Sequence, residues 1–214
     1  MTEDSFRTKG LRNKMIDELR SKGIQHEGVL EAMGKVPRHV FLDNAFIEFA
    51  YRDQAFPIGA GQTISQPSTV ALQTQLLAPE KGEKVLEVGT GSGYQTSILC
   101  AMGCRVYSIE RQKSLFDRTR RILPTLGYNP KLFFADGYKG LPGFAPFQKI
   151  LVTAGAPYVP QELLNQLAPG GILVIPVGAE KQEMTKITRT TSGEFITHTF
   201  GDCKFVPLLQ QKQN

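Results

Sequence analysis

Glycines at alternate positions mark residues 85–94, which read VLEVGTGSGY. Glycine in such a turn lets the backbone reverse tightly and lets a ligand approach without a Cβ in the way. Because this turn would join a buried strand to a helix, it lies where ligands bind in an open α/β sheet. The other interpretation is a plain glycine-rich connection. We predict that the loop holds a cofactor through Gly89, Thr90, Gly91 and Ser92.

The kind of cofactor is indicated by the glycine spacing and by Glu87. The spacing is G-x-G-x-G, whereas dinucleotide-binding loops have G-x-G-x-x-G. Glu87 comes two residues before the first glycine. A carboxylate there would repel a pyrophosphate and would suit a cationic amine or sulfonium. The pattern therefore favours S-adenosyl-L-methionine over NAD as the cofactor.

Two further acidic positions follow later strands. Glu110 ends the second strand, 21 residues after Gly89, where a carboxylate can accept both ribose hydroxyls; Arg111 beside it is a further candidate. Asp136 and Gly137 follow the third strand, where a carboxylate can accept from the adenine amino group. The alternatives are a surface acid at a strand end for the first position and an Asp-Gly turn for the second.

Strand and helix patterns alternate from about residue 78 to residue 177. Short apolar runs predict five strands, at 84–88, 105–109, 131–135, 149–153 and 172–176. Helices are predicted at 68–77, 94–102, 112–123 and 160–167. Buried strands that alternate with helices indicate a parallel sheet with helices on both faces.

Shorter elements flank this region. An amphipathic helix is predicted to end near Gly23, and a second helix at 26–33 is predicted to stop at Gly34. At the other end, 184–189 and 194–200 flank a Thr-Ser-Gly turn, which predicts an antiparallel hairpin. The expected fold class is α/β, a doubly wound, mostly parallel sheet with N-terminal helices and a C-terminal antiparallel hairpin. We expect a single domain over residues 1–214, with 1–60 as a helical extension packed on it.

Composition and charge exclude several classes of protein. Of 214 residues, 41% are hydrophobic and 21% charged, which excludes a disordered chain. The net charge is +5, but the basic residues are scattered; the densest cluster, 111–121, is typical of a solvated helix face rather than a nucleic-acid surface. The three cysteines suit neither a disulfide framework nor a metal site. The polar start shows no signal peptide and no apolar run could span a membrane, so we expect a cytoplasmic protein.

Several motifs together resemble the protein-L-isoaspartate O-methyltransferase family. The resemblance covers nearly the whole chain from Arg38 onward. Its motifs are GQTIS-x-P at 61–67, VLEVGTGSGY at 85–94, VTA-x-AP at 152–157, VIPVG at 174–178 and FVPL at 205–208. The glycine loop is common to many methyltransferases, whereas the Gln-Thr-Ile-Ser stretch is specific to this family. On residue chemistry alone, that stretch could equally be helix caps beside a flexible turn.

The resemblance implies an enzyme that methylates the α-carboxylate of L-isoaspartyl residues in aged proteins, with S-adenosyl-L-methionine as donor. The ester then closes to a succinimide that can reopen to aspartate. Ser65 matches the family's active-site serine, while Gln62, Thr63 and Ile64 match neighbours that wall the cofactor and substrate. Leu209 falls where a C-terminal residue approaches the site. We expect a monomer that acts on isoaspartyl proteins and peptides, without nucleic acid, membrane or metal.

The chain departs from the family pattern at two places, and other functions stay open. Ser68 and Thr69 stand where the family commonly has His-Met, and Ala60 stands where an aromatic residue is common. One alternative is another S-adenosylmethionine-dependent methyltransferase, acting on a small molecule or RNA. A second is a non-catalytic nucleotide-binding module on the same fold. An NAD-dependent oxidoreductase agrees less well with the loop.

Overall fold

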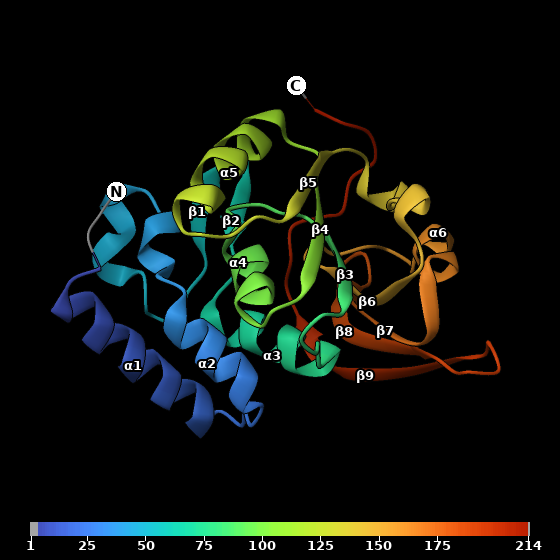
Figure 1. The fold of residues 1–214 in the computed structure, drawn as a ribbon, viewed down its shortest axis with the longest axis horizontal. Coiled ribbons are helices and arrows are strands. Elements are labelled where there is room, and N and C mark those ends of the chain that lie inside the picture. Colours follow the sequence, from blue (N-terminus) through green and yellow to red (C-terminus); the bar gives the residue numbers. More distant parts are fainter. Residues whose placement is uncertain (1–3, 214) are drawn as a thin grey trace.

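A seven-stranded sheet forms the centre of the protein in the computed structural model, which describes residues 4–213 (Figure 1). The strands lie in the order β5-β4-β3-β6-β7-β8-β9. The first five in this order are parallel, and β8 and β9 pair antiparallel at one edge. The predicted fold class is confirmed. The strands are β3 (Lys84–Val88), β4 (Arg105–Glu110), β5 (Lys131–Phe134), β6 (Phe147–Val152), β7 (Leu167–Val177), β8 (Gln182–Arg189) and β9 (Phe195–Cys203).

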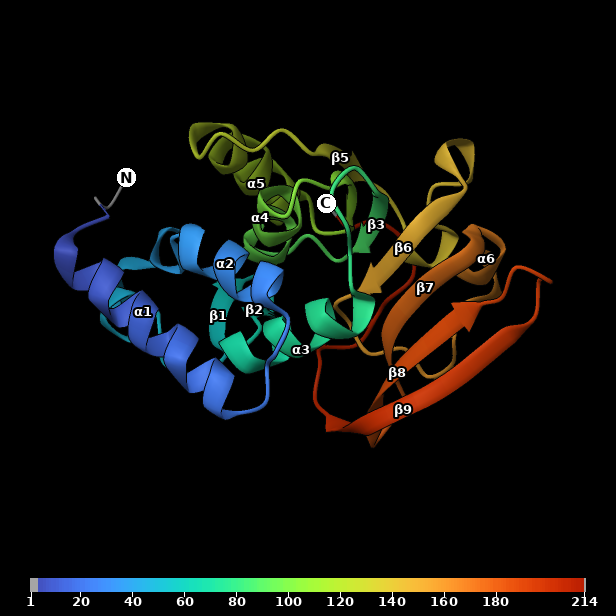
Figure 2. The same ribbon diagram turned by 60° about the horizontal axis from the view of Figure 1, so that its bottom comes forward.

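Both faces of the sheet are covered, because successive side chains of a buried strand point to opposite faces. Val85 packs in a cluster with residues of α3 and α4, whereas Leu86 packs in another with α6 and the 3₁₀ turns. Figure 2 shows α3 and α4 on one side of the strands and α6 beside β7. The helices are α1 (Phe6–Ser21), α2 (Glu27–Lys35), α3 (Pro67–Leu77), α4 (Tyr94–Ala101), α5 (Lys113–Thr125) and α6 (Gln161–Asn165).

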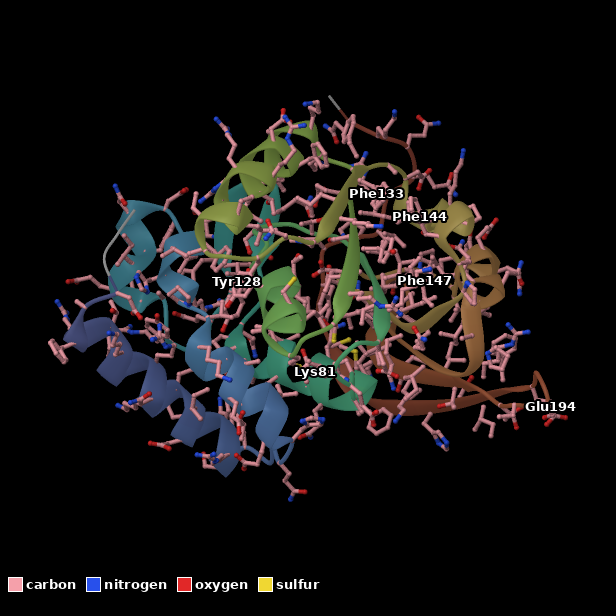
Figure 3. All side chains as sticks on the ribbon, in the orientation of Figure 1. Lys81, Tyr128, Phe133, Phe144, Phe147 and Glu194 are labelled. Carbon is pink, nitrogen blue, oxygen red and sulfur yellow. The ribbon has the colours of Figure 1, made fainter. Side chains whose placement is uncertain are left out.

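An aromatic cluster closes the second face near the start of β6. Phe133, Phe144 and Phe147 gather there (Figure 3), and all three rings lie against Tyr107, with centroid distances of 6.4, 5.3 and 5.6 Å. The ammonium group of Lys84 lies 5.1 Å from the Phe147 ring centroid, where a cation is attracted to the ring face. This cluster therefore packs against β4, β5 and β6 on the sheet face that Leu86 also points to.

The crevice of the sheet lies where the order of the strands reverses. The chain runs from β3 outward to β4 and β5 and then returns across β3 to β6. The connections that follow β3 and β6 therefore leave in opposite directions, and a ligand site is expected between them at the carboxyl ends of the strands.

The N-terminal helices form a layer beside α3 and α4 (Figure 1, blue). A buried arginine ties this layer to the crevice. Arg38 donates to the carbonyl oxygens of Ala50 at 2.8 Å and Gln54 at 3.2 Å, and its guanidinium lies 4.9 Å from the centroid of the Tyr94 ring. Burial lowers the Arg38 pKa to about 10, so it stays cationic at neutral pH. Arg38 thus holds the segment ahead of residue 56 against the first residue of α4.

Some predicted boundaries were wrong. The second helix continues through Gly34 to Lys35. The helix predicted at 160–167 ends at Asn165, because Leu167 pairs with Phe147 and begins β7, which is irregular near this point. The antiparallel pair β1 (Phe56–Gly59) and β2 (Gln62–Ile64) was not predicted. No helix within residues 4–213 is both long and apolar enough to cross a membrane.

Candidate active site

A cavity of about 860 Å³, counted with its open mouth, lies at the carboxyl ends of β3, β4 and β6. Eleven of the predicted site residues line it, namely Gln62, Thr63, Ile64, Ser65, Gly89, Thr90, Gly91, Ser92, Glu110, Arg111 and Gly137. The structure therefore brings together the Gln-Thr-Ile-Ser stretch, the glycine loop and the acid at the end of β4, which lie far apart in the sequence.

The glycine loop makes the floor of the cavity, and its backbone needs glycine. Gly89 has φ +100°, and a Cβ on it would lie 2.4 Å from Oγ1 of Thr153. That hydroxyl donates to the carbonyl oxygen of Gly89 at 2.7 Å. The loop is held from the other side by the Gly89 and Thr90 amides, which donate to the Ile109 carbonyl oxygen. Two neighbouring strands thus fix the loop before any ligand binds.

Glu110 lies at the cavity wall with one hydrogen bond to each carboxylate oxygen. Oε2 accepts from the Gly91 amide and Oε1 from the Gln112 amide, both at 2.8 Å. Burial raises the pKa of the Glu110 carboxyl, and these amide donors oppose the rise. A carboxylate oxygen can accept more than one hydrogen bond. Glu110 can therefore accept from a pair of ligand hydroxyls as well.

Ser65 follows the β1–β2 hairpin, which carries it to the cavity mouth. The turn between the strands has positive φ at Gly59, Ala60 and Gly61, and buried Ile64 anchors the second strand. Ser65 is half-buried, and none of the described residues makes a hydrogen bond with its hydroxyl. The hydroxyl is therefore available to a ligand. The capping alternative for this serine does not apply, since the N-cap of α3 is Gln66.

Glu87 does not line the cavity, contrary to the expectation that it faces a cationic ligand. The pleat of β3 directs it to the α4 face, where it is fully buried and Oε2 accepts from Thr96 at 2.5 Å and Ser108 at 2.6 Å. Ser108 is also hydrogen bonded to Thr90 of the glycine loop at 2.6 Å. Because Ser108 gives its proton to Glu87, Thr90 donates to Ser108. Glu87 therefore acts on the loop through these two hydroxyls.

Burial raises the pKa of Glu87 to about 7, from an ordinary value of 4.5. The folded protein then binds this proton more tightly than the unfolded chain, so the contribution of Glu87 to stability is full below pH 4.5 and is lost as the pH rises through 7. Relative to Glu87→Gln, the free energy of unfolding of the unsubstituted protein should fall by on the order of 3 kcal/mol between pH 4.5 and 8. Urea unfolding across this range measures it, and a constant difference would contradict the assignment.

Asp136 is the second predicted residue that does not line the cavity. Its Oδ1 accepts from the Tyr138 amide at 2.9 Å and its Oδ2 from the Gln211 amide at 2.9 Å. Asp136 and Gly137 thus form a turn, which was the alternative interpretation of this Asp-Gly pair. Gly137 lines the cavity instead, and a Cβ there would lie 2.4 Å from Val88 Cγ1.

The segment after β9 makes a wall that sequence reasoning largely missed. The lining residues in it are Val206, Pro207, Leu208 and Leu209. It is fixed to Gly155, whose amide donates to the Val206 carbonyl oxygen and whose own carbonyl oxygen accepts from Leu208. Arg111 holds the chain just beyond this wall, since its Nε donates to the Gln211 carbonyl oxygen at 2.9 Å. The only sequence features that pointed to this wall were the FVPL motif and the position of Leu209.

Other lining residues that were not predicted lie on the central elements. Thr153 could have been found as a polar residue just beyond a buried strand. The apolar ones could not be told from core by their sequence. They include Val70 of α3, Val88 and Ile109 at strand ends, and Ala154. Two polar residues, Gln73 of α3 and Gln95 of α4, also line the cavity and were not predicted.

The sheet order, the glycine loop after β3 and the acid at the end of β4 define the protein as a member of the S-adenosylmethionine-dependent methyltransferase class. The family model described as protein-L-isoaspartate(D-aspartate) O-methyltransferase matches residues 10–213. The chain therefore belongs to this family.

Relatives and solved structures agree with that family. The protein-L-isoaspartate O-methyltransferase of Flavobacterium psychrophilum is 57% identical over 98% of this chain and 99% of its own. That of Cytophaga hutchinsonii is 59% identical over 97% of this chain and 94% of its own. A Plasmodium falciparum structure of the same description, in complex with S-adenosyl-L-homocysteine, is 26% identical, with a TM-score of 0.81 over 92% of this chain and 98% of its own.

Proposed function

We propose that the protein transfers a methyl group from S-adenosyl-L-methionine to the α-carboxylate of L-isoaspartyl residues in damaged proteins and peptides, so that they can return to aspartate through a succinimide. The observation that carries the proposal is the juxtaposition of the Ser65 hydroxyl and the glycine loop in one cavity. Family membership supplies the substrate class.

The residues around the cavity fit the cofactor. Glu110 has acceptor capacity left for the two ribose hydroxyls, and the positive-φ glycines leave the loop backbone open to close approach. Apolar side chains at Val88, Ile109 and Leu208 suit a flat base. We assign cofactor binding to ten of the eleven predicted residues that line the cavity, all except Ser65. Glu87 does not line the cavity, and we make Asp136 a positioning residue at Gly137. When bound, S-adenosyl-L-methionine supplies an electrophilic methyl group on a cationic sulfur.

The proposed cofactor contacts are Gln62, Thr63, Ile64, Gly89, Thr90, Gly91, Ser92, Glu110, Arg111 and Gly137.

The chain's own residues have a limited task in this reaction. A carboxylate with a pKa of about 3–4 is already ionised at neutral pH, so no general base is required. We assign to the Ser65 hydroxyl a hydrogen bond to one carboxylate oxygen, which turns the other oxygen toward the methyl group. Holding two reactants in line is a large source of rate. The wall at 206–209 lines the cavity, and we assign to it the exclusion of competing water from that side.

A methylation assay on one peptide in its isoaspartyl and aspartyl forms tests the function. With radiolabelled S-adenosyl-L-methionine, we expect turnover of the isoaspartyl form and less than about 1% of that rate for the aspartyl form, because only the first presents a free α-carboxylate at that residue. Equal labelling of both forms, or labelling of neither, would contradict the proposal. Labelling of RNA instead would identify a different methyltransferase.

We further propose that the protein works as a monomer in the cytoplasm, without nucleic acid or membrane. All three cysteines are free, at positions 100, 104 and 203. Burial raises the pKa of Cys100 and of Cys104 to about 12, which keeps both as unreactive thiols. Unpaired cysteines are typical of a reducing compartment.

A further inference from the structure

Two pockets continue outward from Ser65, beyond the cofactor cavity. The first, here called the outer pocket, shares Thr63, Ser65, Thr153 and Val206 with the cavity. The second, here called the lateral groove, shares Gln66, Thr69 and Lys204 with the outer pocket and runs between α3 and the end of β9. The three hollows therefore form one path that starts at the proposed reacting atoms and leads to the surface.

Lys204 is the unbalanced charge on this path. The other charged residues of the lateral groove have partners, since Lys22 pairs with Asp53 at 2.5 Å and Asp202 with Lys181 at 3.1 Å. Lys204 is exposed, lines both the outer pocket and the lateral groove, and forms no ion pair with any residue between 4 and 213. The middle of the path thus carries one uncompensated positive charge.

We propose that the outer pocket and the lateral groove hold the substrate chain beside its isoaspartyl residue, and that Lys204 selects an acidic side chain within two residues of it. This rests on the proposed function. The reacting residue stays joined to the rest of its chain, so the chain must leave the cavity past Ser65. An extended chain advances roughly 3.4 Å per residue, so the second residue out lies within reach of a lysine in the outer pocket.

The test uses isoaspartyl peptides that differ only in the second residue from the isoaspartate, which is Glu, Gln or Lys, on either side of it. For the unsubstituted protein we expect kcat/KM to fall in the order Glu, Gln, Lys on at least one side, by roughly two- to fivefold per step, as for an exposed ion pair. The ratio of kcat/KM between the Glu and the Lys peptide should fall toward one in 0.5 M salt, where the Debye length is only about 4 Å.

Lys204→Glu should reverse this order, so that the Lys peptide becomes the best substrate. The matched control is Lys81→Glu, the same charge change at an exposed residue before β3, separated from the cavity by the length of that strand (Figure 3). It should keep the original order. Provided that the Gln peptide is methylated, two results would overturn the proposal. One is the same order of kcat/KM in both variants, and the other is equal kcat/KM for the three peptides in the unsubstituted protein. No methylation of the Gln peptide would overturn the proposed function as well.

Discussion

Replacing Ser65 by alanine is expected to lower kcat for isoaspartyl methylation by about 10- to 100-fold, the effect of losing one hydrogen bond to a charged group. The hydroxyl lines the cavity and has no partner among residues 4–213, so its loss leaves no other group unsatisfied. Affinity for S-adenosyl-L-methionine should stay within about twofold, because the glycine loop and Glu110 are unchanged.

Single-turnover methylation and calorimetric binding of the cofactor measure the two quantities separately. Ser192→Ala, an exposed serine in the turn between β8 and β9, is the matched control and should behave as the unsubstituted protein. An unchanged single-turnover rate in Ser65→Ala would show that the hydroxyl does not orient the carboxylate. Parallel loss of cofactor binding would assign Ser65 to the cofactor instead.

Gly89→Ala is expected to destabilise the protein by about 2–4 kcal/mol and to weaken cofactor binding at least tenfold. Two costs combine, since φ of +100° strains an alanine and its Cβ would lie 2.4 Å from Thr153 Oγ1. The clash would displace the hydroxyl that holds the loop from the β6 side.

Gly10→Ala is the control for that substitution. Gly10 lies in α1, is exposed, and a Cβ there would meet nothing within 4 Å. It should stabilise the protein by about 0.5–1 kcal/mol, since alanine is the better helix former. Chemical unfolding with and without cofactor measures both variants. A Gly89→Ala protein with native stability and native cofactor affinity would contradict the assigned rigidity of the loop.

Features that depend on neighbours in the sequence were predictable. The strands from 84 to 152 are short apolar runs, and the glycine loop and Glu110 lie at their carboxyl ends as the α/β pattern requires. The two acids that were misplaced also have local causes. The pleat directs Glu87 to the same face as Val85, and Asp136 accepts from the amide two residues ahead, as Asp does in turns.

Features that depend on distant contacts were not predictable. The β1–β2 turn places Ala60 at φ +51°, a conformation that its side chain does not signal. The wall at 206–209 exists because Gly155 pairs with Pro207, some fifty residues later in the chain. Such a pairing cannot be predicted from the hydrophobic pattern or the turn residues of a single segment.

The wall at 206–209 also has a consequence for how the protein is made. These residues leave the ribosome after every strand of the sheet has been synthesised, because the chain emerges from its N-terminal end during synthesis. A nascent chain can therefore assemble its sheet before this wall of the cavity is in place. The methyl donor cannot assist the earlier steps of folding by binding to a finished site, and the enzyme becomes active only after residues 206–209 have been synthesised and have packed on Gly155.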